Sequence, residues 1–343
     1  RGEVMDSAYE EIKGERDGKT RLQGRYEIGE KIGEGGMARV YRGWDSHIGQ
    51  KVAIKVLKRK EKEAQEAFCR EAARMKGLHH PGIPILYDFW QEEGKWYLVM
   101  EYLEGISLEQ YLLKQGAMPQ QQAFRGIWQL TQSLSCLHGQ NPPLIYCDMK
   151  PANILMTPEG HWKLLDFGAA REKGYDRSRW EKNAGTYGFA APEQTGQEGA
   201  GNRVDERSDI YALGKTWYHL LTGQNPAQVP YGSQPLSCYV PDLVEGTEQI
   251  IRKMTRPLPE ERYQSTEELE QVLEKLEQSD GRWDGRNGKK GWKRGRKSFF
   301  IRRIEEQIWL AQAKQEYTFY QDSCIMKSSQ SGRSGQAGIP GKE

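Results

Sequence analysis

The segment of residues 144–155, LIYCDMKPANIL, constrains this chain more than any other part of it. Its two ends are apolar, which predicts two short buried strands joined by a tight loop. The loop carries three polar side chains, those of Asp148, Lys150 and Asn153. A carboxylate that receives a hydroxyl proton, a cation beside a phosphate and an amide oxygen for a metal are what phosphoryl transfer requires. The spacing therefore indicates a phosphoryl-transfer site.

The chain has 343 residues, enough for one large two-lobed domain or two ordinary domains, together with tails. A hydrophobic fraction of 36% and a charged fraction of 29% are typical of a soluble globular protein with solvated extensions. No run approaches the roughly 18 to 20 consecutive apolar residues of a membrane helix. The chain begins at Arg1 without the order of a secretory signal, so we infer an incomplete or processed N-terminus.

The cysteines argue against a disulfide framework and against a zinc site. There are five of them, far apart and never in a C-x-x-C spacing. The adjacent His79 and His80 precede Pro81, where a turn is expected rather than a metal site. A reducing cytoplasm is the simplest interpretation.

A glycine-rich hairpin is expected near the start of the folded part. Residues 26–41, YEIGEKIGEGGMARVY, have apolar positions alternating on either side of a glycine cluster. Glycines in such a turn let backbone N–H groups approach phosphates without a side chain in the way. Taken alone, the pattern fits an ordinary flexible hairpin equally well.

The next strand places a lysine among apolar neighbours. Residues 51–57, KVAIKVL, predict a strand in which the ammonium of Lys55 points inward and needs a counter-charge. Residues 68–78 have helical apolar spacing, with Glu71 on the same face. The candidate partners are Glu71, Glu63 and Glu66, and the resemblance to a known family that is given below favours Glu71.

Further elements follow in order. Two more strands are expected at residues 81–90 and 95–102, which would complete a small antiparallel sheet. Helices are expected at residues 107–115, where Ser107 would be the N-cap, and at residues 120–139, which carry a broad apolar stripe. The chain thus changes from strands to helices after Gly105.

The order of these motifs resembles that of eukaryotic-type protein kinases. The D-x-K-x-x-N loop at Asp148 follows a G-x-G-x-x-A-x-V turn at Gly33 and a V-A-I-K strand at Lys55. It precedes the D-F-G motif at Asp166 and the A-P-E motif that ends at Glu193. The resemblance covers residues 26–278, and the wording GEGGMARVY is similar to the bacterial serine/threonine branch. It implies an α+β, two-lobed fold with a small antiparallel β-sheet lobe and a larger, mainly helical lobe.

The resemblance also implies ATP and Mg²⁺ and assigns residues to them. Asp148, Lys150 and Asn153 would be catalytic, and Asn153 with Asp166 would bind the metal. Met100 would gate the adenine pocket, whose ring Val40, Ala53 and Leu155 would sandwich; plain core packing would explain these apolar residues too. The implied ATP-binding set is Ile32, Gly33, Glu34, Gly35, Gly36, Val40, Ala53, Lys55, Glu71, Met100, Glu101, Leu103 and Leu155.

Four other positions match residues that shape the site in the family. Thr186 would help to seat a serine or threonine substrate. Glu193 would be buried and paired with Arg262, and Asp209 would brace the catalytic loop from the start of a long central helix. A serine/threonine protein kinase that acts on protein substrates, with possible autophosphorylation, is the expected function. The alternative is a pseudokinase, a nucleotide-binding scaffold without transfer; a small-molecule phosphotransferase fits the A-P-E segment less well.

Two positions depart from the family pattern. Tyr146 and Cys147 stand where the family usually has histidine and arginine before the catalytic aspartate. Tyr146 can fill the hydrophobic place of the histidine. By the resemblance, the arginine binds a phosphate on the activation segment, which a cysteine cannot do. We therefore expect activity that does not depend strongly on phosphorylation there, although Ser178 and Thr186 remain candidate modification sites.

The expected organisation is a disordered leader (1–25), a kinase domain (26–278) and a basic, disordered tail (279–343). The domain would comprise an N-lobe (26–100), a hinge (101–105) and a C-lobe (106–278). Residues 281–303 carry ten Lys or Arg against one Asp, a net charge of +9, whereas the whole chain is +2. A solvated tail is the plainest interpretation, and contact with the inner face of an anionic membrane is the alternative. No specific nucleic acid is expected, a cytoplasmic location is, and the sequence gives no oligomeric state.

Overall fold

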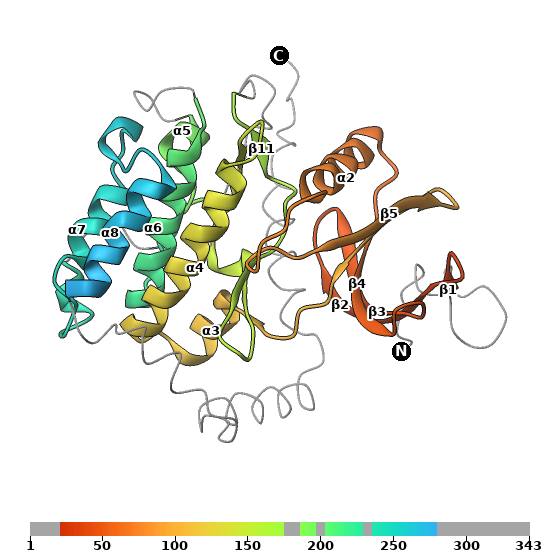
Figure 1. Cartoon of the computed structure of the whole chain (residues 1–343), viewed down its shortest axis with the longest axis horizontal. Coiled ribbons are helices and arrows are strands. Elements are labelled where there is room, and N and C mark those ends of the chain that lie inside the picture. Colours follow the sequence, from red (N-terminus) through yellow and green to blue (C-terminus); the bar gives the residue numbers. More distant parts are fainter. Residues whose placement is uncertain (1–20, 175–185, 197–202, 229–234, 280–343) are drawn as a thin grey trace, which may run out of the picture. The chain divides into compact units, whose positions relative to one another are not determined.

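The computed structural model describes residues 21–174, 186–196, 203–228 and 235–279 (Figure 1). The chain divides into two compact units, Arg1–Asp284 and Gly285–Glu343, and every described residue belongs to the first. Among the described residues, no helix has both the length and the apolar character needed to cross a membrane.

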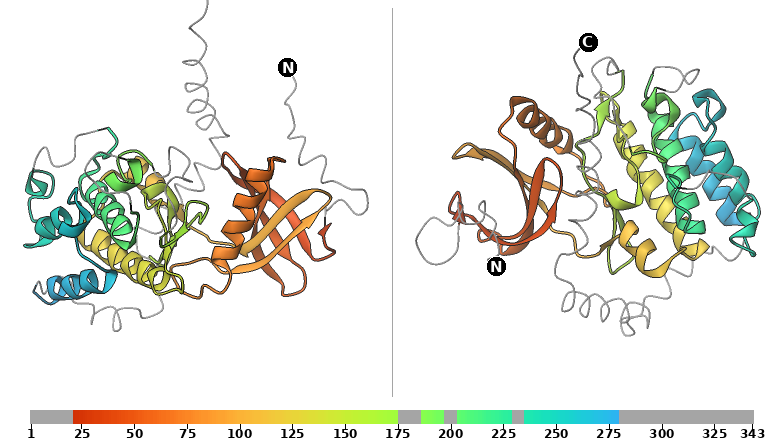
Figure 2. Two further views of the ribbon diagram at one scale, coloured as in Figure 1. Left: turned by 90° about the horizontal axis from the view of Figure 1, so that it is seen from above. Right: turned by 180° about the vertical axis from the view of Figure 1, so that it is seen from behind.

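An antiparallel sheet forms the N-terminal part of the first unit, with the strand order β1-β2-β3-β4-β6-β5. Figure 2 shows this sheet curled, with helix α2 lying along it. The elements are β1 (Arg21–Leu22), β2 (Tyr26–Glu34), β3 (Ala38–Asp45), β4 (Gln50–Leu57), α2 (Lys62–Met75), β5 (Leu86–Glu92) and β6 (Lys95–Glu101).

The period of two along the strands separates a core face from a site face. On β4, Val52, Ile54 and Val56 lie in a buried cluster that also contains Tyr26 and Tyr97. The residues between them, Ala53 and Lys55, therefore face the other side of the sheet. Val40 and Lys55 are cross-strand partners, so the glycine hairpin and the lysine strand meet on this site face.

Three boundaries differ from the sequence prediction. Residues 21–25 are not part of a disordered leader, because β1 pairs with β2 and Arg25 bonds the buried Asp45 at 2.6 Å. Helix α2 begins at Lys62, earlier than expected, and ends at Met75. Strand β5 begins only at Leu86, since Pro84 lacks the N–H that a paired strand would use.

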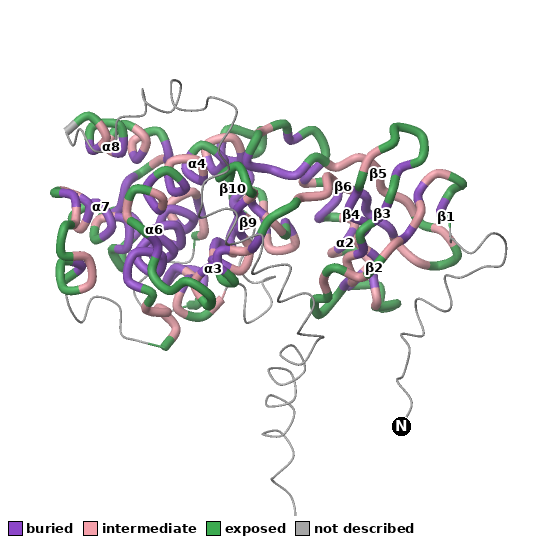
Figure 3. Tube along the Cα trace, turned by 90° about the horizontal axis from the view of Figure 1, so that it is seen from below, coloured by how far each residue is buried: buried purple, intermediate pink, exposed green. Residues whose placement is uncertain are grey.

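The C-terminal part of the unit is mainly helical, and this confirms the two-lobed α+β class. Its α-helices are α3 (Leu108–Gln115), α4 (Gln120–His138), α5 (Pro192–Thr195), α6 (Glu206–Thr222), α7 (Thr247–Met254) and α8 (Thr266–Ser279). Its short 3-10 helices are Pro151–Asn153, Leu236–Cys238 and Pro259–Glu261. Helix α6 is buried along most of its length, as its colour in Figure 3 shows, and it contacts α4 and α7.

Two sequence predictions in this part are confirmed. Ser107 is the N-cap of α3 and makes a capping box with Gln110, which satisfies two backbone N–H groups at the helix start. Helix α4 begins at Gln120 and ends at His138, with Gly139 as its C-cap.

Short strands carry the segment that contains Asp148. They are β7 (Ile106–Ser107), β8 (Leu144–Ile145), β9 (Ile154–Met156), β10 (Trp162–Leu164) and β11 (Arg171–Glu172). The two apolar runs of residues 144–155 are strands, as expected, but they belong to different sheets. Strand β9 lies between β10 and β7, whereas β8 pairs with β11. The loop between β8 and β9 is therefore anchored at each end to a different strand partner.

Candidate active site

Asp148 lies at the centre of a compact set of polar contacts. Its carboxylate accepts hydrogen bonds from Asn153 Nδ2 at 2.7 Å and from the Thr186 hydroxyl at 2.9 Å. Lys150 Nζ lies 2.9 Å from the same carboxylate and donates to Thr186 Oγ1 at 2.6 Å. The structure thus brings together the three polar residues of the loop and Thr186, which is far along the chain.

The backbone that leads into Asp148 is fixed from helix α6. The carboxylate of Asp209, which is fully buried, accepts hydrogen bonds from the backbone N–H groups of Tyr146 and Cys147, both at 2.8 Å. His138 Nε2 lies 2.9 Å from the same carboxylate. These contacts join α6, the end of α4 and the loop at one buried acid.

The two unusual residues before Asp148 are both buried. The Tyr146 hydroxyl donates to the backbone carbonyl of Leu165, and its ring meets Phe167 edge-on at 5.5 Å between centroids. Tyr146 therefore occupies a hydrophobic place, as the sequence predicted. Burial raises the pKa of the Cys147 thiol well above its usual value, so the thiol is neutral and weakly reactive.

Lys55 connects the sheet to α2 and to the strand end after β10. Its ammonium lies 2.7 and 2.8 Å from the two carboxylate oxygens of Glu71, the predicted partner, and 3.4 Å from Asp166 Oδ1. Burial opposes the charged form of Lys55, but the two carboxylates outweigh it and raise the pKa of Lys55. The geometry of two short contacts therefore holds Lys55 against Glu71.

Asp166 has a backbone φ of 54°, in the left-handed region that side chains seldom adopt. Its Oδ1 accepts the N–H of Gly168 at 3.1 Å. Desolvation opposes ionisation, yet Lys55 and the Gly168 N–H prevail and lower the pKa of Asp166. Its side chain is 55% exposed, so this carboxylate is accessible to a ligand.

Asn153 and Asp166 are suited to hold a metal ion together. Leu165 N–H donates to the backbone carbonyl of Asn153 at 2.7 Å, which ties the two segments side by side. Asn153 uses its Nδ2 for Asp148, and among the described residues nothing donates to its Oδ1 or to Asp166 Oδ2. Two oxygens are few protein ligands for a metal ion. This number suits Mg²⁺, whose other ligands in such sites are phosphate oxygens and waters. Nowhere in the described ranges do three or more His, Cys, Asp or Glu residues gather as metal ligands.

Charged contacts hold Glu34, the last residue of β2 before the glycine-rich turn. Glu34 contacts Lys58 at 2.8 Å and Lys31 at 2.9 Å, and the bond from Lys58 is the main reason why its pKa is lowered to about 2. A Cβ atom at Gly35 would approach nothing closer than 3.9 Å, and one at Gly36 nothing within 4 Å. Contacts inside the chain therefore do not explain the glycines at the tip.

Sequence reasoning missed one pair at the predicted hinge. Lys163 Nζ lies 2.7 Å from both carboxylate oxygens of Glu101, and Glu101 also exchanges hydrogen bonds with the backbone of Ile85. Lys163 is the cross-strand partner of Leu155 and stands three residues before Asp166. Its one signal in the sequence is alternation with the apolar Trp162 and Leu164, which does not identify a partner.

The remaining predicted residues lie as follows. Ala53 pairs across strands with Met100, next to the predicted hinge. Gly33 pairs with Val40 in the hairpin, and Ile32 is 43% exposed. Leu103 follows β6 and is half-buried. The adenine-binding roles of these residues stay predictions.

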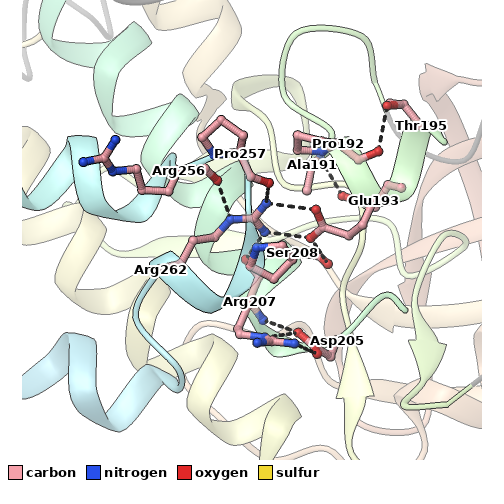
Figure 4. A network of polar contacts seen from close by, with 12 residues as sticks. Ala191, Pro192, Glu193, Thr195, Asp205, Arg207, Ser208, Arg256, Pro257 and Arg262 are labelled. Atoms are coloured by element: carbon pink, nitrogen blue, oxygen red, sulfur yellow. Dashed lines mark hydrogen bonds and ion pairs between the residues drawn. The ribbon is translucent and has the colours of Figure 1, made fainter. Parts of the chain in front are cut away.

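A buried ion pair fixes the segment that follows Thr186. Arg262 contacts both carboxylate oxygens of Glu193, at 2.7 and 2.9 Å, and Ser208 Oγ donates to Glu193 at 2.7 Å (Figure 4). The structure thus brings Arg262 to Glu193, as the sequence predicted. Because Ser208 is next to Asp209, the same helix end supports both this segment and the loop of Asp148.

Three features together are those of the protein kinase fold. They are a curled sheet with one helix, a mainly helical part, and a buried lysine–glutamate pair in addition to the loop of Asp148, Lys150 and Asn153. The chain belongs to the protein kinase domain family, whose model matches residues 26–282. The kinase domain of PknI from Mycobacterium tuberculosis matches in fold, with a TM-score of 0.58 and 24% identity, over 73% of this chain and 96% of that one.

Several curated relatives are bacterial proteins. The chain is 33% identical over 275 residues to a probable serine/threonine-protein kinase of Streptomyces coelicolor, covering 74% of this chain and 40% of the relative. It is 32% identical over 269 residues to the serine/threonine-protein kinase PrkC of Bacillus subtilis, covering 73% and 40%. PknB of Mycobacterium tuberculosis is 33% identical over 271 residues, covering 73% and 42%. The chain thus spans about two fifths of the length of these relatives.

Proposed function

We propose that this chain transfers the γ-phosphate of ATP to serine or threonine hydroxyls of proteins, including its own. The observation that carries the proposal is the 2.9 Å hydrogen bond from the Thr186 hydroxyl to Asp148 Oδ1. A carboxylate oxygen that accepts an aliphatic hydroxyl here is placed to accept the hydroxyl of a substrate. The names of the curated relatives support the same reaction.

Each residue of the loop has a separate task in this reaction. Asp148 orients the acceptor hydroxyl and takes its proton as the oxygen attacks the phosphorus. The ammonium of Lys150, beside Asp148 and Thr186, stabilises the negative charge on the transferred phosphoryl group. Asn153 keeps Asp148 in place through its amide hydrogen bonds.

On the nucleotide side, Lys55 would bind the α- and β-phosphates, with Glu71 fixing its position. The open space at Gly35 and Gly36 supports a close approach of phosphates to the hairpin backbone. Asn153 and Asp166 would hold Mg²⁺ through the oxygens that no described donor uses. Such an ion neutralises phosphate charge when it is bound.

A radiolabel transfer assay tests the proposal. Wild-type protein should label itself or a generic protein substrate in the presence of Mg²⁺ and ATP, on serine or threonine. Asp148→Asn keeps the size of the side chain but removes the base, so labelling should fall to background. Equal labelling by both proteins contradicts the role of Asp148. Nucleotide binding without any labelling points to a pseudokinase instead.

Two further predictions concern regulation and the tail. Because Cys147 replaces the phosphate-binding arginine, phosphatase treatment should leave the activity unchanged, and loss of activity would contradict this.

The basic residues 281–303, which lie outside the described residues, are proposed to contact anionic membrane surfaces. Full-length chain should co-sediment with anionic vesicles at low salt and be released by high salt; no binding at low salt excludes it.

A further inference from the structure

The last carbonyl group before Asp148 is bonded by a side chain outside the predicted site set. Gln194 Nε2 donates to the carbonyl oxygen of Cys147 at 2.8 Å, while Gln194 Oε1 accepts the N–H of Ala191 at 2.9 Å. The side chain is buried, with the whole residue only 5% exposed. One amide thus links the start of α5 to the peptide group that leads into Asp148.

The backbone of Cys147 needs such support. Its φ is 68°, in the left-handed region, which is unfavourable for a residue with a side chain. Its N–H donates to Asp209 Oδ1 at 2.8 Å, and its carbonyl accepts from Gln194. The two contacts come from different helices, Asp209 from α6 and Gln194 from α5. Together they set the direction in which the chain enters Asp148.

Gln194 also makes a connection that the side chain of Cys147 does not. Among the described residues, the buried thiol donates a hydrogen bond to the carbonyl oxygen of Ile145, at 3.4 Å, and makes none to residues 186–196. The amide of Gln194 joins this segment to the loop of Asp148 without any charge. The connection is therefore complete without a phosphate group.

We propose that Gln194 is a positioning residue for the transfer reaction: it fixes the Cys147 peptide group and, through it, the carboxylate of Asp148. The inference rests on the proposed function for its effect on rate. Its geometric part, that Gln194 restrains the loop of residues 144–155, stands independently of activity.

Two variants and one matched control test it. Gln194→Met keeps the length of the side chain and removes both hydrogen bonds. Gln194→Glu still accepts the Ala191 N–H but has no donor for the Cys147 carbonyl when ionised. The control is Gln129→Met, because Gln129 also bonds two backbone groups, Trp162 N–H at 2.9 Å and Gly160 O at 3.3 Å, away from Asp148.

Rate measurements on the full chain should distinguish misplacement of Asp148 from a general disturbance of the fold. Misplacing Asp148 by a fraction of an ångström should lower kcat about tenfold in both Gln194 variants, with KM for ATP within about twofold of wild type. Gln129→Met should keep its kcat. Equal kcat in the Gln194 variants and the control would overturn the proposal, and so would a rise in KM for ATP that matches the fall in kcat.

Hydrogen exchange of the peptide covering residues 144–155 gives a second readout that needs no activity. Exchange should be faster in Gln194→Met than in Gln129→Met, compared at equal distance below each melting temperature. Unchanged exchange overturns the geometric part. If wild-type protein transfers no phosphate, the proposed function fails by itself, and the exchange comparison still decides the inference.

Discussion

Two buried ion pairs, one in each part of the fold, differ in how completely they are satisfied. The guanidinium of Arg262 donates all five of its N–H groups, to Glu193 and to the carbonyl oxygens of Arg207, Arg256 and Pro257. The Arg262 and Glu193 side chains are 0% and 1% exposed. Figure 4 shows the acceptors surrounding this guanidinium on several sides. Nothing in this pair is left for a ligand.

The pair of Lys55 and Glu71 is open by comparison. One ammonium lies between two carboxylates, those of Glu71 and Asp166, and the Asp166 side chain is 55% exposed. The group therefore has an excess of negative charge and an accessible oxygen. Burial alone therefore does not identify a functional pair: a complete pair stabilises the fold, whereas an incomplete one is available to a nucleotide and its metal.

The largest expected effect is on stability, from a pair of isosteric substitutions. Glu193→Gln leaves the Arg262 charge buried without a counter-charge, so the free energy of unfolding should fall by about 3–5 kcal/mol. Glu71→Gln should cost under about 2 kcal/mol, because Lys55 retains Asp166 at 3.4 Å. Urea unfolding of the two variants measures both values. Equal losses would break the comparison.

Contacts between residues of one motif, or on one face of one helix, could be predicted from the sequence. Asp148, Lys150 and Asn153 come together because they share one short loop, and Glu71 lies on the apolar face of α2. The Glu101–Lys163 and Gln194–Cys147 contacts could not be predicted, since they join ordinary side chains far apart in sequence and depend on the packing of β10 and α5. The start of α2 was missed because residues 62–67 lack an apolar stripe before Phe68. Strand β1 was not predicted because a strand of two residues cannot show an alternation of apolar and polar positions.

A smaller effect is expected from His219, in the buried helix α6 beside Phe189. Burial lowers the pKa of His219 to about 4, whereas an unfolded histidine titrates near 6.5. Between pH 4 and pH 6.5 the unfolded state binds more protons at this histidine than the folded state does. The contribution of His219 to the free energy of unfolding is therefore fully present above about pH 6.5 and is lost as the pH falls toward 4. The loss from pH 7 to pH 5 should be about 2 kcal/mol.

Unfolding of His219→Phe at pH 7 and pH 5 checks this, because the variant should lack that part of the acid sensitivity. The exposed His161→Phe is the control and should keep the wild-type dependence. An unchanged slope in His219→Phe would show that the buried helix tolerates a charged imidazole.

The open pair should show its role in kinetics rather than in stability. In Glu71→Gln, Lys55 is no longer fixed toward the site, so kcat/KM for ATP should fall about tenfold. Steady-state rates at varied ATP measure it. Activity of Glu71→Gln within a factor of two of wild type would contradict a role of the Lys55–Glu71 pair in nucleotide use.

The smallest effect is expected at the Glu101–Lys163 pair, whose side chains are 25% and 13% exposed. Glu101→Gln weakens one ionic contact between the predicted hinge and β10, so KM for ATP should rise about two- to threefold with kcat unchanged. Glu104→Gln, which breaks the exposed pair with Lys51, is the matched control and should change nothing. An equal rise in KM for ATP in both variants would show that the loss of a surface charge, and not of the Glu101–Lys163 contact, is responsible.

The rise in melting temperature that Mg²⁺-ATP produces should distinguish the two ion pairs, because a ligand stabilises only the state that binds it. Glu193→Gln should melt at a lower temperature than wild type yet keep the full nucleotide-induced shift. Glu71→Gln should melt at a higher temperature than Glu193→Gln, closer to wild type, and lose most of that shift. The opposite pattern, with the shift lost in Glu193→Gln and kept in Glu71→Gln, would contradict the assignment of one pair to the fold and the other to the nucleotide.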